Sequence, residues 1–205
     1  MSSSTARWIQ WSGIAALVCC VGFAVFVVVL AGNGIATAEP GTALSVLLGV
    51  THLAAYVSML AVLLSARASG RVAPSRSGQI AFFMMAASLM GLTAAMIGLA
   101  IPSVPELPTV VVATASFAGA HLSAPLFGIA LWKTSRAGRP TAALFIAVVP
   151  VLVVVVALNI LGMQVFPAYF EAVLALAFAS LGYELAFGAG ATRTSQEPTA
   201  APGPT

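Results

Sequence analysis

The sequence has very little charge: charged residues make up 6% of its 205 residues, and aspartate does not occur. A soluble globular domain carries about 25% charged residues, so this chain cannot cover a folded surface with groups that water solvates. Hydrophobic residues make up 60% of the chain, and the mean hydropathy is +1.07. The composition therefore predicts an integral membrane protein whose main partner is the lipid bilayer.

Signatures of common enzyme classes are also missing. The sequence contains no P-loop, no HExxH and no GxSxG motif, and no apolar run holds a pair of carboxylates near its middle. Phosphoryl transfer and metalloprotease chemistry therefore have no support. The sequence favours a protein that is not an enzyme, although it leaves the question open.

Cysteine is rare, and the two that occur, Cys19 and Cys20, are neighbours. Adjacent residues of a helix point about 100° apart, so these thiols do not converge on a metal ion. With no other cysteine there is no disulfide framework, and we interpret both as small apolar residues. The eight basic residues are scattered along the chain and form no nucleic-acid-binding stripe.

Six apolar runs are long enough to cross a bilayer, which requires about 20 predominantly apolar residues. Turn-forming residues separate them. The expected spans are residues 9–32, 42–66, 79–101, 109–132, 142–163 and 168–188. The sequence thus predicts an all-α bundle of six transmembrane helices in one domain, residues 1–188, with short loops. Residues 189–205 are polar and rich in proline, so we expect a disordered cytoplasmic tail.

The basic residues lie on one side of these spans, while the only charged residues in the connections on the other side are Glu39 and Glu106. The basic residues are Arg7, Arg67, Arg71, Arg76, Lys133, Arg136, Arg139 and Arg193. The positive-inside rule therefore places both termini in the cytoplasm of a plasma-membrane protein. The preference for arginine over lysine suggests a bacterial source with GC-rich coding.

A cleaved signal peptide would begin in a similar way, with a basic start and small residues at Ala36 and Ala38. The apolar core of a signal peptide is about 7–15 residues long. Here the apolar run extends from Gly13 to Gly32. We therefore expect the first span to be retained, and cleavage is the alternative.

Both histidines of the chain lie inside apolar runs: His52 in LLGVTHLAAY and His121 in FAGAHLSAPL. At about 1.5 Å per residue, they lie roughly 15 and 18 Å below the expected starts of spans two and four. An ionisable side chain at that depth marks a candidate functional site, because exposure to lipid would be costly.

The surroundings of the two histidines echo one another. Arg67 follows His52, and Arg136 follows His121, at the same spacing, so one offset of 69 relates both pairs (121 − 52 and 136 − 67). This hints at a duplicated helix pair in parallel orientation.

Three interpretations of the histidines remain open. Each imidazole can hydrogen-bond across a helix interface as packing. Alternatively, the pair can line a pathway for a proton, a metal ion or a small solute. As a third possibility, His52 and His121 can be the axial ligands of a haem b in an electron-transfer protein. The nearest arginines, fifteen residues away (67 − 52), lie about 22 Å from the histidines, too far to pair with haem propionates.

Further polar residues can extend a pathway, and Asn159, Glu171 and Glu184 are the candidates. The small residues Gly91 and Gly98 suggest helix contacts, and they leave a homo-oligomer or a membrane-protein partner open. The leading hypothesis is a small transporter or channel-like protein with a polar site at His52 and His121. A haem protein and a structural accessory subunit are the alternatives, and no substrate or metal is indicated.

Overall fold

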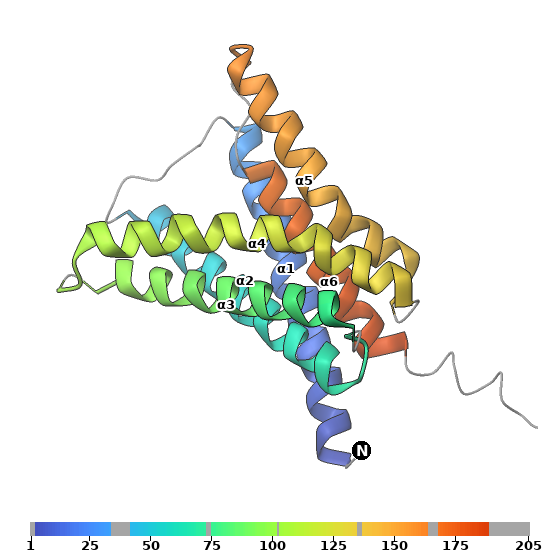
Figure 1. Cartoon of the computed structure of the whole chain (residues 1–205). Helices are drawn as coiled ribbons and strands as arrows, with labels where there is room; N and C mark the ends of the chain where they lie inside the picture. The colour runs from blue at the N-terminus through green and yellow to red at the C-terminus, as the bar shows by residue number, and fades with distance from the viewer. Residues whose placement is uncertain are drawn as a thin grey trace, which may run out of the picture.

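The computed structural model describes residues 3–33, 42–72, 75–101, 103–134, 137–163 and 168–188. In these segments the chain forms six α-helices, all long and apolar enough to cross a membrane (Figure 1). They are α1 (Ser3–Gly32), α2 (Ala43–Ala68), α3 (Arg76–Leu99), α4 (Glu106–Thr134), α5 (Arg139–Ile160) and α6 (Ala168–Phe187). The prediction of an all-helical protein with six such helices is confirmed, and the tail of residues 189–205 lies outside the described residues.

Local chemistry explains several helix ends. The hydroxyls of Thr42 and Ser75 accept hydrogen bonds from Ser45 N and Gly78 N, each at 3.2 Å, and so cap the first turns of α2 and α3. Gly70, just after α2, has φ 73°, a backbone conformation that glycine adopts without steric cost. These caps position α2 and α3 as an antiparallel pair.

Helix α6 is the centre of the bundle: 61% of its apolar span is buried, against at most 44% in any other helix. It packs on α1, α5 and α2. Glycines let α1 and α6 approach closely, because a Cβ at Gly13 would lie 2.5 Å from Gly182 O, and one at Gly182 would lie 2.6 Å from Gly13 O. Such small-residue crossings are typical of membrane helices.

Helices α3 and α4 form a hairpin that lies across the other helices in Figure 1. Two glycines face serines of the partner helix: a Cβ at Gly91 would meet Ser116, and one at Gly119 would meet Ser88. A Cβ at Gly98 would lie 3.1 Å from Thr109, a looser contact. Gly91 and Gly98 therefore serve helix contacts inside the chain, as the small-residue pattern indicated.

The bundle has two halves that differ in packing. In what we call the closed half, where α2 ends beside Arg67 and α4 ends beside Lys133, most helices bury one face. In the opposite, open half, residues 43–54 of α2 and 110–119 of α4 include no buried residue. Residues 149–160 of α5 include only Val155. The side chains of the three helices are therefore incompletely covered there, although α4 still packs on α3. In Figure 1 the far ends of α4 and α5 point in different directions.

Candidate functional site

His52 lies on α2 where the open half meets the closed half. Its Nδ1 is 2.7 Å from the carbonyl oxygen of Leu48, one turn earlier. A carbonyl oxygen only accepts, so Nδ1 must carry a proton and donate. The other ring nitrogen, Nε2, is therefore the atom that is free to act.

That atom faces a carboxylate. His52 Nε2 lies 3.6 Å from Oε2 of Glu171 on α6, and the two side chains are 16% and 20% exposed. An unprotonated Nε2 and a carboxylate are both acceptors and would repel one another, so a proton belongs between them. Glu171 also lies in the first turn of α6, where the helix dipole favours a negative charge. The geometry therefore suits an imidazolium–carboxylate pair.

His121 on α4 has the same internal arrangement. Its Nδ1 is 2.8 Å from the carbonyl oxygen of Phe117, and the offset of 69 that relates the histidines also relates these carbonyls (117 − 48). The side chain is only 2% exposed, and no described residue makes a hydrogen bond to its Nε2. A buried polar atom without a partner is costly in a folded protein, so this nitrogen requires an explanation.

The start of α6 joins the two histidines. Its consecutive residues Phe170 and Glu171 contact different imidazoles: the ring of Phe170 lies 5.1 Å from that of His121, and Glu171 pairs with His52. Glu171 is also within electrostatic range of His121 and of Tyr56. The structure thus brings three predicted site residues, His52, His121 and Glu171, to one level, and we call them the His–Glu cluster.

Aromatic rings surround this cluster. Phe23 of α1 lies 4.7 Å from the ring of His52, and Phe117 lies 4.2 Å from that of His121. With Phe170 and Tyr56 they leave the imidazoles in a largely apolar setting. Unpaired charge is expensive there, so protons within the cluster will tend to keep it neutral.

The geometry bears on the metal and haem interpretations. Across the described segments, no group of three or more His, Cys, Asp or Glu side chains could hold a metal ion. Haem iron would bind an imidazole nitrogen, and the free nitrogen of His52 faces the carboxylate of Glu171. Coordination at His52 would therefore require Glu171 to move away.

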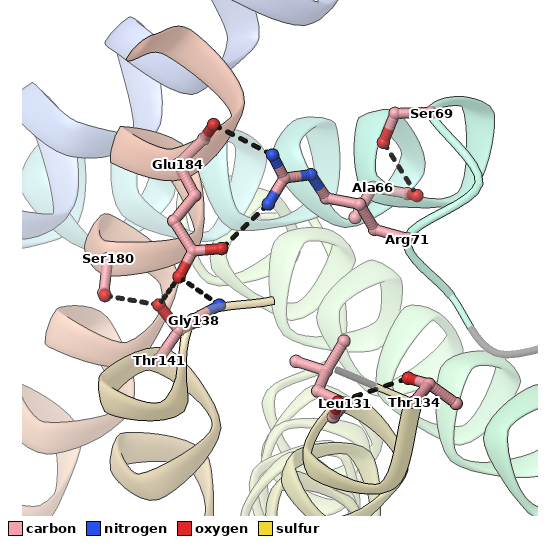
Figure 2. A network of polar contacts seen from close by, with 9 residues as sticks. All are labelled: Ala66, Ser69, Arg71, Leu131, Thr134, Gly138, Thr141, Ser180 and Glu184. Carbon is pink, nitrogen blue, oxygen red and sulfur yellow. Dashed lines mark hydrogen bonds and ion pairs between the residues drawn. The ribbon is translucent and has the colours of Figure 1, made fainter. Parts of the chain in front are cut away.

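Glu184, the second carboxylate of α6, lies at the other end of the helix, in the closed half (Figure 2). Its Oε2 accepts from Arg71 Nη1 at 2.8 Å, and its carbonyl oxygen accepts from Arg71 Nη2 at 3.1 Å. Its Oε1 accepts from the backbone N of Gly138 at 2.9 Å and from the Thr141 hydroxyl, which also bonds to Ser180 at 2.6 Å. This Glu184 network ties the chain after α2 to the start of α5 and the end of α6.

The remaining candidates lie elsewhere. The side-chain amide of Asn159 donates to Val155 O of its own helix at 2.8 Å. Glu184 lies thirteen residues from Glu171 (184 − 171), or about 20 Å along the helix, so the structure does not bring it to the histidines. From the sequence, Arg71 was predicted only to orient the protein in the membrane, and Thr141 had no predicted role. The sequence did carry a signal for the Arg71–Glu184 pair: an arginine follows one expected span, and a glutamate lies at the same membrane level in another.

Comparison with protein-family models, with curated proteins and with solved structures finds no match to this chain. The arrangement of side chains therefore provides the argument for function. It separates two polar centres. In the Glu184 network the carboxylate accepts several hydrogen bonds, whereas in the His–Glu cluster Nε2 of His121 has no described hydrogen-bond partner.

Proposed function

We propose that this protein is a small transporter or channel-like protein of a bacterial plasma membrane, with its translocation site at the His–Glu cluster. The supporting observation is the buried Nε2 of His121, which has no hydrogen-bond partner among the described residues, while the His121 ring contacts Phe170, the neighbour of Glu171 on α6. Intramembrane ionisable groups that face the bundle interior usually mark substrate or ion pathways. The arginine-rich closed half faces the cytoplasm in this proposal, by the positive-inside rule.

A purely structural role fits His121 less well than His52, whose Nε2 pairs with Glu171 of another helix. An imidazole that serves as packing would use its nitrogens to join two helices. Here each Nδ1 donates to a carbonyl of its own helix, Leu48 or Phe117, and contributes nothing to the helix interfaces. The bond instead orients the ring and directs Nε2 away from its own backbone, as hydrogen bonds to the other ring nitrogen do in functional histidines.

The packing of the two halves supports the same proposal. The Glu184 network closes the bundle beside Arg71, while α2 and α4 lack buried residues over 43–54 and 110–119. The His–Glu cluster lies between these halves. A site at mid-depth, with a hydrogen-bonded network on one side and incompletely buried stretches of α2 and α4 on the other, is compatible with access from one side of the membrane.

Cysteine accessibility tests this proposal without knowledge of the substrate. In a Cys19→Ala, Cys20→Ala background, Ser45→Cys and Gly49→Cys lie on the His52 face of α2, whereas Val50→Cys and Val57→Cys lie on the opposite face. A charged, membrane-impermeant thiol reagent should modify the first pair and leave the second unmodified, because charged reagents react poorly in lipid. Equal reaction at all four positions, or reaction at neither of the first two, would contradict a polar pathway.

A haem b protein is the alternative from another class. In its favour, Nδ1 of both histidines donates to a backbone carbonyl, the orientation usual for metal-bound imidazoles. Optical spectra of the purified protein, oxidised and then dithionite-reduced, separate the two proposals. A Soret band that disappears in both His52→Ala and His121→Ala would establish haem and replace the transporter proposal. A featureless spectrum from cells supplied with haem would eliminate the alternative.

A further inference from the structure

We infer that the ligand of the His–Glu cluster is a proton, shared between Nε2 of His52 and the carboxylate of Glu171 and exchanged with bulk water. This inference rests on the proposed function, because it names the ion that the pathway would carry or couple to. It follows from the direction of the hydrogen bonds, the charges around the pair and its partial exposure.

The hydrogen bonds determine where the exchangeable proton is held. The bond to Leu48 O keeps one proton on Nδ1 of His52 in every state of the ring. Any second proton must therefore bind at Nε2 or at Glu171, whose nearest atoms are 3.6 Å apart. Without this second proton, the lone pair of His52 Nε2 faces the negatively charged carboxylate of Glu171. With it, the pair is an imidazolium with a carboxylate, or an imidazole with a carboxylic acid.

The neighbouring groups favour the protonated state. His52 packs against Phe23 of α1 and Tyr56 of α2, and the titratable groups within electrostatic range of Glu171 are Tyr56 and His121. The other ion pair formed by described residues, between Arg71 and Glu184, lies at the opposite end of α6 and so does not neutralise Glu171. One added proton changes the net charge of the His52–Glu171 pair from −1 to 0, which stabilises it in an apolar setting.

Proton exchange at this site needs no other reactant. Binding forms one N–H or O–H bond at the expense of an O–H bond of hydronium, and release returns the proton to water. Nothing is oxidised or reduced. The side chains of His52 and Glu171 are 16% and 20% exposed, so the pair is neither sealed from its surroundings nor freely solvated. Exchange requires that this exposed part of the pair reaches water along the proposed pathway.

An infrared-detected pH titration of the full chain in lipid vesicles tests the inference, with the proton itself as the probe. Wild type should show a step in which the infrared bands of the His52 imidazole and of the Glu171 carboxyl group change together. Glu171→Gln and His52→Gln should each abolish this step, because both groups share one proton. Glu171→Asp, which keeps a carboxylate, should retain it.

A matched control makes the test specific. Glu106→Gln removes an exposed carboxylate of α4 outside the His–Glu cluster and should keep the step. A step that survives in Glu171→Gln, or that is absent from wild type, would overturn the inference. If Ser45→Cys and Gly49→Cys are accessible but the step is missing, the pathway stands and carries something other than a proton. If the step is present but those positions are inaccessible, the transport proposal fails while the proton site remains.

Discussion

The two carboxylates of α6 lie on one helix and differ in almost every respect. Glu184 receives hydrogen bonds from Arg71, Gly138 and Thr141, so its acceptors are occupied and three parts of the chain are held together. Glu171 has one described ion-pair partner, His52, at a distance beyond hydrogen bonding. A saturated carboxylate stabilises the fold, whereas an undersaturated one keeps the capacity to bind something else.

The helix packing near the two carboxylates also differs, and it is tighter near Glu184. Near Glu184, Gly13 and Gly182 let the backbones of α1 and α6 touch. Gly49, on the half of α2 beyond His52, has no atom within 4 Å of where its Cβ would be. Tight packing of α6 near Glu184 and open space along α2 before His52 suggest that rigidity and function are divided between these two regions. Four substitutions test that division.

The largest effect is expected from Glu184→Ala. It leaves Arg71 without its ion pair and the Gly138 N–H without its acceptor, and breaking such a pair costs about 3 kcal/mol. The free energy of unfolding in mild detergent should therefore fall by that amount. A double-mutant cycle with Arg71→Ala measures the coupling, and additive effects of the two substitutions would show that the network does not hold the closed half.

Gly182→Ala should come next. Its Cβ would lie 2.6 Å from Gly13 O, so α1 and α6 must separate, at a cost of about 2 kcal/mol. Gly49→Ala is the matched control: it meets no atom and should be neutral or stabilise the protein by up to about 1 kcal/mol through helix propensity. Thermal unfolding of both variants gives the comparison, and equal losses would contradict the difference in packing.

His121→Phe should stabilise the protein, by about 1 kcal/mol. The substitution removes a buried nitrogen without a described partner and keeps an aromatic ring between Phe117 and Phe170. Unfolding free energies of the variant and wild type measure the gain. A loss of stability would mean that Nε2 has a stabilising partner in the membrane, and that the nitrogen is structural.

Glu171→Gln should have the smallest effect on stability, below about 1 kcal/mol, because its contact with His52, at 3.6 Å, is too long for a hydrogen bond. The same variant should abolish the shared proton step entirely. Stability and proton titration, measured on one sample, thus separate the two carboxylates of α6. A loss as large as that in Glu184→Ala would mean that both ends of the helix are structural.

Much of the architecture was predictable from the sequence, because lipid imposes simple rules on it. A span requires a long apolar run, and each of the six expected spans overlaps one helix, including α4, which continues through Pro125. The depth of His52 and His121 followed from the same helical rise. Glu171 was a candidate for the polar pathway because it begins the last span, although one-dimensional spacing does not show which face of α6 it occupies.

Composition and periodicity, which act locally along the chain, determined the membrane class, the number of helices and which ionisable residues lie within them. Tertiary structure alone decided the partners: Glu171 with His52, Glu184 with Arg71, and Nε2 of His121 with no described residue. The physical reason is that helices with nearly uniform apolar surfaces can rotate about their axes at little cost in lipid. Their faces are selected by close glycine contacts such as Gly13 with Gly182, which form between segments far apart in the sequence.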